Sequence, residues 1–445
     1  MKFSKKFSKK FSKSLLTLAL VLASAIVGST AFAQSSTALE ASRGEYVVRL
    51  GNCVACHTVE GGKPFAGGLK MAVPKLGAIY ATNITPDPET GIGNYSFEDF
   101  DDAMRKGIAK NGHRLYPAMP YPSYAKMTVD DMRALYDYFM NEVEPVNLAD
   151  QASEIPAVLN WRWPLAVWNV MFGKLSTYQV EDDQSEAWNR GAYLVQGLGH
   201  CGACHTPRGI AFQEKTLDED RSSFLAGAQL DHWSASSLNG DINSGLGRWS
   251  EADIVEYLKT GKNRFGTAIG TMVEVINNST QHMTDDDLMA MAVYLKSLPA
   301  VAEAGDAPYA YDAAAEVALS SMSLDEPGSA TYFNYCLSCH LYDGSGHGEH
   351  MPPLAGNPIL LDPDGSSLIN VTLNGSLRVI AEGRPEHYDM PYFRSSLSDK
   401  EIADVISYIR KAWGNNAPAV SKADVTAMRD ATDPTMNDVV VLRMK

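Results

Sequence analysis

Cysteine is scarce in this 445-residue sequence, and none of it lies outside one short motif. All six cysteines belong to three copies of C-x-x-C-H, which leaves no cysteine for a disulfide framework. Positive charge is also in deficit, because 38 Lys and Arg face 53 Asp and Glu, for a formal net charge of -15. Net charge alone therefore gives no reason to expect binding to nucleic acid or to an anionic bilayer. The sequence also lacks a Rossmann fingerprint and a P-loop, so it shows no nucleotide site.

Long apolar runs are missing except near the start of the chain. Six lysines precede an uncharged apolar run from Leu15 to Gly28, and Ala31-Phe32-Ala33 follows as an A-x-A cleavage site. This run is shorter than the ~20 residues that span a bilayer. We therefore predict a signal peptide over residues 1–33 and export to the periplasm, with an uncleaved anchor as the alternative. No later segment has ~18 uncharged apolar residues, so no internal transmembrane helix is predicted.

The three C-x-x-C-H motifs are typical of covalent haem attachment. At such a site two thiols form thioethers with the haem vinyl groups, and the adjacent histidine binds the iron. A thioredoxin-like C-x-x-C would explain neither the histidine after every pair nor the threefold repetition. We therefore predict three covalently bound haem c groups. The attachment residues are Cys53, Cys56, Cys201, Cys204, Cys336 and Cys339, and the proximal ligands are His57, His205 and His340.

Each motif belongs to a repeated segment, and the three segments are called repeats 1 to 3. A short helix is expected before each motif, and a middle helix that ends at a glycine is expected after it. A last helix begins at Thr128, Thr284 or Ser398, with apolar residues placed as in a hydrophobic staple. The first helices are expected at 43–48, 190–195 and 330–335, and the middle helices from Ser96 to Gly107, Ser250 to Gly261 and Asp364 to Gly375.

The repeats predict an all-α protein with three tandem domains and one haem in each. The expected domains span residues 34–147, 187–302 and 326–415. Residues 148–186 and 303–325 are expected to be linkers, and the first linker holds an aromatic cluster of Trp161, Trp163, Trp168 and Phe172. Residues 416–445 are expected to form an extension over the third domain that ends in a strand at residues 439–442.

A sixth iron ligand is expected in the loop between the middle and last helices of each repeat. Met119 and Met390 are each followed by proline, which suits a fixed thioether, and both are predicted as distal ligands. Met272 lies at a matching offset in repeat 2 and is predicted as the distal ligand there, although it lacks the proline. Met283 is the staple residue and Met351 precedes the middle helix, so neither is preferred, and the remaining histidines are expected to make surface or propionate contacts. A distal methionine blocks exchange at the iron, so these sites should carry electrons rather than activate oxygen.

Several longer segments carry a resemblance to a known family. They are residues 80–87, 113–124, 247–250, 279–284 and 352–358. With them the chain, from about Arg43 to Trp413, resembles the tri-haem cytochrome c subunits of membrane-associated bacterial alcohol, gluconate, sorbitol, fructose and aldehyde dehydrogenases. The resemblance implies class I-like cytochrome c domains and Met119, Met272 and Met390 as axial ligands.

The resemblance also implies a role and partners. The chain would be an electron-transfer subunit without catalysis of its own, fed by a flavin, quinoprotein or molybdenum dehydrogenase subunit. It would pass electrons to ubiquinone or another respiratory acceptor at the periplasmic side of the inner membrane, with peripheral attachment. Attachment could use the Trp161 to Phe172 cluster, for which an interdomain core is the alternative.

Two other functions are open at the level of sequence. A self-contained haem enzyme, such as a peroxidase or nitrite reductase, would need one iron with a displaceable ligand. Repeat 3 is the best candidate for that exception, because His347 and His350 follow its motif closely. A freestanding electron shuttle without a dehydrogenase partner is the second alternative.

Overall fold

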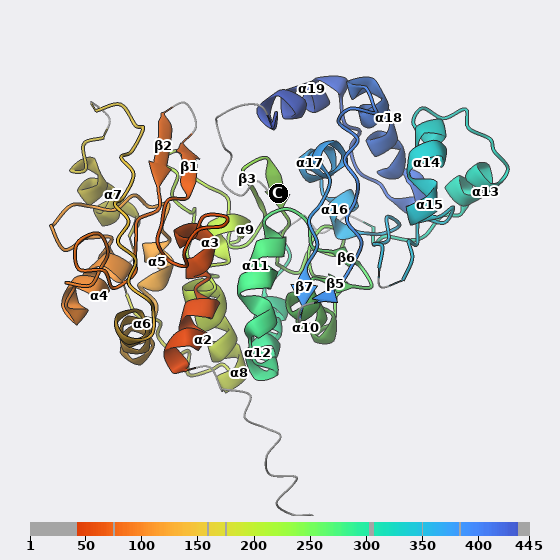
Figure 1. The fold of residues 1–445 in the computed structure, drawn as a ribbon. Helices are drawn as coiled ribbons and strands as arrows, with labels where there is room; N and C mark the ends of the chain where they lie inside the picture. The colour runs from red at the N-terminus through yellow and green to blue at the C-terminus, as the bar shows by residue number, and fades with distance from the viewer. Residues whose placement is uncertain are drawn as a thin grey trace, which may run out of the picture. The chain divides into compact units, whose positions relative to one another are not determined.

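The computed structural model describes residues 42–434, apart from 74–75, 158–159, 174–175, 302–306, 349 and 382–383. The expected signal peptide and the expected strand at 439–442 lie outside the described residues. Short helices joined by long loops make up most of the fold (Figure 1). Among the described residues, every helix is too short or too polar to cross a membrane.

The three repeats contribute helices in the order that the sequence predicts. Repeat 1 contains α2 (Arg43–Leu50), α3 (Cys53–His57), β1 (Lys70–Val73), β2 (Gly77–Tyr80), α4 (Phe97–Lys106), α5 (Tyr121–Tyr124) and α6 (Val129–Asn141). The segment after it contains α7 (Pro164–Phe172). Repeat 2 contains α8 (Glu186–Tyr193), a π-helical turn (Leu194–Leu198), α9 (Gly202–His205), β3 (Ala228–Leu230), β4 (Trp233–Ala235), α10 (Glu251–Thr260), β5 (Lys262–Asn263), β6 (Gly266–Thr267), α11 (Met272–Asn278), a 3-10 turn (Thr280–His282) and α12 (Asp285–Ser297).

Repeat 3 follows the same order and carries an additional helix at its end. It contains α14 (Ser329–Tyr335), α15 (Leu337–His340), α16 (Pro358–Leu361), α17 (Ser366–Asn374), β7 (Ile380–Ala381), β8 (Arg384–Pro385) and α18 (Asp399–Ile409). The helix α13 (Ala314–Ser320) precedes it, and a 3-10 turn (Ala412–Gly414) and α19 (Lys422–Ala431) follow it.

Local capping explains where the middle and last helices begin and end. Ser96 and Ser250 each form a capping box, and Gly107 and Gly261 end these helices in the left-handed conformation that glycine favours. The helix in repeat 3 ends at Gly375 as predicted, but its N-cap is Gly365 and not Asp364. The Asp364 side chain instead accepts a hydrogen bond from the Ser366 amide, two residues on, and so forms a local turn before the helix.

In the described part of the chain, four two-stranded antiparallel sheets accompany the helices, so the predicted all-α fold is confirmed only as a helix-rich one. Their strands are two to four residues long, as in the pairing of Lys70 with Tyr80 and of Val73 with Gly77. Strands this short carry too few residues for a visible alternation of apolar and polar side chains. The fold is therefore helix-rich with small hairpins in its loops.

Glycine allows the first and last helices of each repeat to cross closely. A Cβ atom on Gly44 would lie 2.5 Å from the Ala134 carbonyl oxygen, and one on Gly191 would overlap the Ala290 carbonyl oxygen. Repeat 3 lacks the Arg-Gly pair of the other repeats, but Gly328 makes the equivalent approach to α18 from the N-cap of α14. The sequence therefore uses glycine at the same crossing in all three repeats.

Repeats 1 and 2 share one continuous hydrophobic core, whereas repeat 3 has a core of its own that includes α19. Two tyrosines join repeats 1 and 2 in a reciprocal way. Tyr46 donates to Asp287 at 2.8 Å, and Tyr193 donates to Asp131 at 2.6 Å. The Tyr46 hydroxyl also accepts a hydrogen bond from the backbone amide of Thr284, which caps the last helix of repeat 2. The Tyr193 hydroxyl likewise accepts one from the amide of Thr128, which caps the last helix of repeat 1. Arg43 and Arg190 complete the arrangement by pairing with Asp131 and Asp287 in their own repeats.

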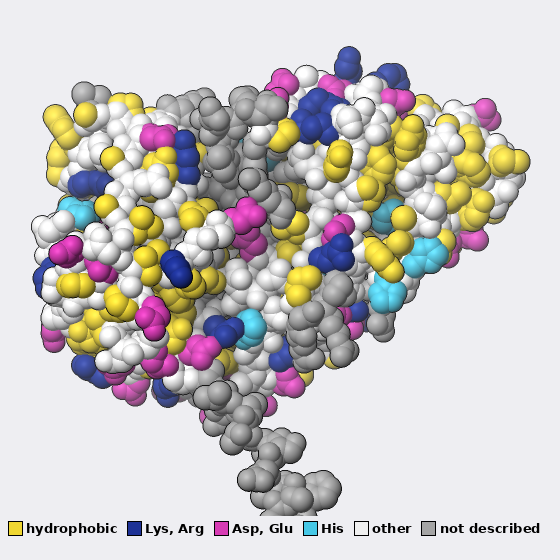
Figure 2. Space-filling view, viewed as in Figure 1, with side chains coloured by type: hydrophobic (Ala, Val, Ile, Leu, Met, Phe, Trp, Pro, Cys, Tyr) yellow, Lys and Arg dark blue, Asp and Glu magenta, His cyan; other side chains and the backbone are white. Residues whose placement is uncertain are grey.

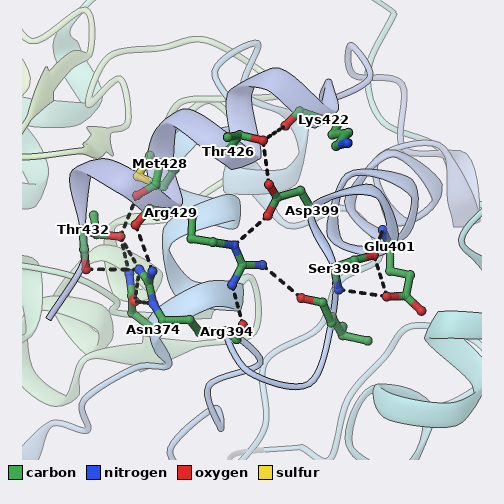
Figure 3. Close-up of polar contacts among 11 residues, drawn as sticks. Asn374, Arg394, Ser398, Asp399, Glu401, Lys422, Thr426, Met428, Arg429 and Thr432 are labelled. Carbon is green, nitrogen blue, oxygen red and sulfur yellow. Dashed lines mark hydrogen bonds and ion pairs between the residues drawn. The ribbon is translucent and has the colours of Figure 1, made fainter. Parts of the chain in front are cut away.

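The C-terminal helix α19 packs on α17 and α18 through Val425 and Met428, which are both buried. Figure 3 shows the polar contacts that accompany this packing. The carboxylate of Asp399 accepts from Arg429 at 2.6 Å and from Thr426 at 2.6 Å. Arg394 reaches the end of α19 and donates to the Thr432 hydroxyl at 2.6 Å. On the face drawn in Figure 2, basic and acidic side chains are interspersed, so the acidic excess is spread over this face.

Candidate haem sites

Each C-x-x-C-H motif forms a single helical turn directly after the first helix of its repeat. In repeat 1 the chain turns at Asn52, whose φ of 48° is left-handed, and α3 then carries both cysteines and His57. Cysteines three residues apart on a helical turn lie on the same face, so both thiols can reach one planar ligand. The same turn ends at His205 in α9 and at His340 in α15.

A backbone carbonyl orients each motif histidine. The Nδ1 atom lies 2.7 Å from the Thr82 oxygen in His57, 2.7 Å from the Ser236 oxygen in His205 and 3.2 Å from the Pro352 oxygen in His340. Because a carbonyl only accepts, Nδ1 carries the proton and Nε2 keeps its lone pair for a metal. Burial also lowers the pKa of all three imidazoles, which favours the neutral, ligating form.

The second and third motifs open into one cavity. It is lined by Cys201, Cys204 and His205 from repeat 2 and by Cys336, Cys339 and His340 from repeat 3. Met272 and Met390 also line it, among mainly apolar side chains. At its edge Ser367 accepts from the Ser234 amide at 2.8 Å and donates to the Ser234 carbonyl at 3.1 Å, which joins α17 to β4. Paired thiols, a free imidazole nitrogen and a thioether in an apolar cavity fit haem groups at both motifs.

The first and second motifs are also close to each other. The helix α11, which begins at Met272, packs against α3 of repeat 1. His200 of repeat 2 packs on Tyr124 with ring centroids 5.5 Å apart, and its Nε2 lies 3.3 Å from the Gly51 carbonyl oxygen. Tyr124 donates to the same oxygen at 2.9 Å. Residues next to the second motif therefore hold the turn that presents the first.

Several known proteins that are similar to this chain are named as cytochrome subunits of dehydrogenases. The cytochrome c family model matches residues 41–141 and 326–413. The chain is 47% identical over 418 residues to the gluconate 2-dehydrogenase cytochrome c subunit of Pantoea cypripedii, covering 93% of this chain and 94% of that protein. It is 48% identical over 418 residues to an alcohol dehydrogenase (quinone) cytochrome c subunit of Gluconacetobacter polyoxogenes, covering 92% of this chain and 88% of that protein. It is 37% identical over 410 residues to the fructose dehydrogenase cytochrome subunit of Gluconobacter japonicus, covering 87% of this chain and 82% of that protein.

The chain belongs to this family of dehydrogenase cytochrome c subunits. It is thus an electron-transfer subunit that takes electrons from a partner dehydrogenase, and it is not itself the catalytic enzyme. Family membership also implies covalently bound haem c.

The thiols of this cytochrome subunit do not resemble those of a disulfide oxidoreductase. Burial raises the pKa of Cys53, Cys201 and Cys336 to about 12. A nucleophilic C-x-x-C cysteine needs a lowered pKa, because the thiolate is the reactive form. The motif environment therefore disfavours thiol exchange and suits a covalent attachment site.

The three methionines predicted as axial ligands lie half-buried in three different local settings. Met119 precedes α5, and its carbonyl accepts from the Tyr121 amide at 2.8 Å. The Met390 backbone is fixed from both sides by Ser376, through a 2.9 Å bond to its amide and a 3.1 Å bond to its carbonyl. Met272 is the first residue of α11, so a helix start takes the place of the Met-Pro loop in repeat 2. The axial roles of all three remain predictions.

Three further methionines, Met283, Met291 and Met351, also line the shared cavity, a position for which the local sequence offered no signal. Met283 is buried at the staple position of α12 as predicted, yet it also lines the cavity. Met351 lines the same cavity from the loop after the third motif, although loop packing was expected for it. The presence of a methionine at the cavity therefore does not by itself identify a distal iron ligand. A Met351 variant is accordingly the natural comparison for a Met390 variant.

The remaining histidines differ from expectation at two positions. His200 and His387 were expected at the surface or beside propionates, but His200 packs against repeat 1 and His387 is buried and accepts from the Val379 amide. His347 and His350 of repeat 3 are exposed. Neither belongs to the lining of the shared cavity, so the structure offers no support for an open iron site built from them.

Proposed function

We propose that this cytochrome c subunit carries three haem c groups, one in each repeat, and relays electrons in the periplasm from its dehydrogenase to ubiquinone or another respiratory acceptor. The expected domains at 34–147, 187–302 and 326–415 would each enclose one group. Bound haem supplies one-electron redox chemistry at each site. The residues of this chain would hold the haem groups in position, supply the ligands to their irons and exclude water from their surroundings.

The observation that carries the proposal is the adjacency of the three motifs. Cys201, Cys204 and His205 share a cavity with the third motif, and the segments on either side of them pack against the first. Repeat 2 thus lies between the other two sites. An apolar cavity spanning two attachment sites excludes water from both and suits transfer of electrons between groups held there.

The same arrangement suits carriers with both axial positions filled. His57, His205 and His340 would serve as proximal ligands and Met119, Met272 and Met390 as distal ones. Methionine ligation raises the reduction potential relative to a second histidine and leaves no position for oxygen or peroxide. The partner would be a flavin, quinoprotein or molybdenum subunit that oxidises an alcohol, sugar, sugar acid or aldehyde.

The test combines haem counting with recovery of the partner. The tagged chain is purified from membranes of its native host, its haem c content is measured per polypeptide, and dye reduction is assayed with a panel of alcohols, aldehydes and sugar acids. We expect three haem groups and one associated dehydrogenase activity. The double variants Cys53→Ala/Cys56→Ala, Cys201→Ala/Cys204→Ala and Cys336→Ala/Cys339→Ala should each lose one third of the haem. Two haem groups in the native chain, or a pure chain with no associated activity, would contradict the proposal.

A further inference from the structure

The second attachment motif differs from the other two at the residue after its first cysteine. This residue is Gly202 in repeat 2, whereas it is Val54 in repeat 1 and Leu337 in repeat 3. The carboxylate of Glu214 occupies the space that a side chain would fill there, because a Cβ atom on Gly202 would lie 2.5 Å from Glu214 Oε2. A carboxylate oxygen therefore lies against the attachment turn α9, where the other two motifs carry an apolar side chain.

A loop that folds back over the motif holds Glu214 in this position. Arg208 and Glu214 pair across the loop as an isolated antiparallel bridge. The Lys215 amide closes the loop by donating to the Pro207 carbonyl at 2.9 Å. The Arg208 guanidinium joins the loop to α9, because it donates to the Ala203 carbonyl at 2.5 Å. The position of the carboxylate is thus fixed by the backbone on both sides of it.

The Glu214 carboxylate has no neutralising partner in direct contact. Among the described residues, none donates a hydrogen bond to it, and Arg208 and Lys126 act on it only through their charge. Both cations donate to backbone carbonyls instead, and Lys126 reaches the Leu217 carbonyl at 2.7 Å. Burial raises the pKa of Glu214 to about 7, so its charge changes near neutral pH.

A second carboxyl group faces the same motif from another element. Asp231 follows β3, which packs against α9 (Figure 1). Burial raises the pKa of the Cys204 thiol, and the charges of Glu214 and Asp231 raise it further, so both carboxyls lie within electrostatic reach of this attachment atom. The space beside Gly202 is filled by Glu214 and not by Asp231. Glu214 is therefore the carboxyl that contacts the attachment turn.

A negative charge beside a one-electron site lowers the reduction potential of that site. The oxidised site carries one more positive charge than the reduced site, so a nearby carboxylate stabilises the oxidised form more. The coupling is reciprocal, and reduction of the site therefore raises the proton affinity of the carboxyl. The reduction potential is thus lower at high pH, where the carboxyl is ionised, and higher at low pH, where it is protonated.

We propose that Glu214 couples proton uptake to electron transfer at the second motif and so sets the reduction potential of this site. When one electron from the partner dehydrogenase enters the site, a Glu214 carboxylate oxygen binds one proton from water. Glu214 returns that proton to water when the electron moves to a neighbouring site. The side chain is half-buried, so water can exchange protons with it. The inference rests on the proposed three-haem relay and deepens it by naming a residue that acts through its charge on the middle site.

The test is a spectroelectrochemical titration of the full haem-loaded chain between pH 5 and pH 9, in which the midpoint potential of each haem group is followed. In the wild type, one midpoint should fall as the pH rises, by about tenfold in the equilibrium constant for reduction, or about 59 mV for a one-electron couple. Glu214→Gln should match the wild type at pH 5, exceed it by that amount at pH 9 and lose this pH dependence.

Three further variants locate the effect. Asp220→Asn removes an exposed carboxylate from the same region of repeat 2 and should leave every midpoint as in the wild type. Gly202→Ala keeps Glu214 but fills its space, so it should weaken the pH dependence while the charge of the chain is unchanged. The double variant Cys201→Ala/Cys204→Ala should lack the pH-dependent midpoint, which assigns that midpoint to the second motif.

Each outcome decides the proposal. An unchanged pH dependence in Glu214→Gln would overturn it, as would a dependence that is lost in Asp231→Asn but kept in Glu214→Gln. If Glu214→Gln does not bind haem in repeat 2, the titration of Gly202→Ala decides in its place. Three haem groups with midpoints independent of pH would refute the role of Glu214 and leave the relay intact, whereas fewer than three haem groups in the wild type would refute the relay itself.

Discussion

The crossing of α8 and α12 gives a quantitative prediction for Gly191→Ala. A Cβ atom at residue 191 would lie 2.7 Å from the Tyr294 Cβ atom and would overlap the Ala290 carbonyl oxygen. Carbon atoms in good contact are about 3.5–4.0 Å apart, so the helices would have to separate by about 1 Å. Tyr294 lies in the core that repeats 1 and 2 share, and both Tyr294 and Ala290 are buried.

Two opposing effects set the size of the loss. Alanine is favoured over glycine within a helix by about 0.5–1 kcal/mol. Overpacking of a tightly packed site costs about 1–3 kcal/mol. Because the overlap involves backbone atoms that cannot rotate away, we expect overpacking to dominate, with a net loss of about 1–2 kcal/mol. For a core of this size, that corresponds to a fall in Tm of roughly 2–8 °C.

The assay is thermal unfolding of the haem-loaded protein, followed by far-ultraviolet circular dichroism and by haem absorbance. The matched control is Gly197→Ala in the π-helical turn after α8, where a Cβ atom would have its nearest neighbour at 3.5 Å. That variant should be neutral or slightly stabilised. A Tm for Gly191→Ala at or above that of the wild type would refute the assigned role of the glycine, as would an equal loss in both variants.

Three further predictions concern other parts of the chain. The Thr426 hydrogen bond and the Arg429 guanidinium hold the pKa of Asp399 below its usual range. The Asp399 carboxylate therefore stabilises the fold above pH ~4, and this stabilisation is lost as the pH falls further. In urea unfolding, Asp399→Asn should lower the free energy of unfolding by about 1–2 kcal/mol at pH 7 and by almost nothing near pH 3. Carbon monoxide should bind one haem of the reduced Met390→Ala variant, and it should bind neither the reduced wild type nor Met351→Ala. Binding to Met351→Ala alone would reassign the distal ligand of repeat 3 to Met351. Tyr193→Phe should lower stability by about 1 kcal/mol or more in the same urea assay, and an unchanged midpoint would show that its hydroxyl bond contributes nothing.

Local chemistry made the helix boundaries predictable. Ser96, Ser250 and Ser398 each satisfy the first amides of a helix with their own side chains, and the signal lies within four residues of sequence. The attachment motifs are equally local, since two cysteines and a histidine occupy one helical turn. Asp364 misled the prediction because an aspartate caps a turn as readily as it caps a helix.

Features that depend on distant partners were not predictable in this way. The carbonyl of Ser236 that orients His205 lies 31 residues away, and the Asp287 partner of Tyr46 lies 241 residues away. Nothing in the local pattern of residues 161–171 distinguishes an apolar surface from an apolar core, because composition is the same in both. Only the inward position of Asn169 reveals which side of α7 faces the protein.

The reciprocal tyrosine and aspartate bonds between repeats 1 and 2 have an evolutionary consequence. Each repeat offers the same donor and the same acceptor to the other, as the two subunits of an isologous homodimer do. Such an interface arises without any new sequence when a self-associating ancestor is duplicated into one chain. The interface between repeats 1 and 2 thus has the form of a fused dimer, whereas repeat 3 packs on repeat 2 through a small cluster that includes Val273, Ile276 and Val379. A single-repeat protein restored from repeats 1 and 2 should therefore associate with itself.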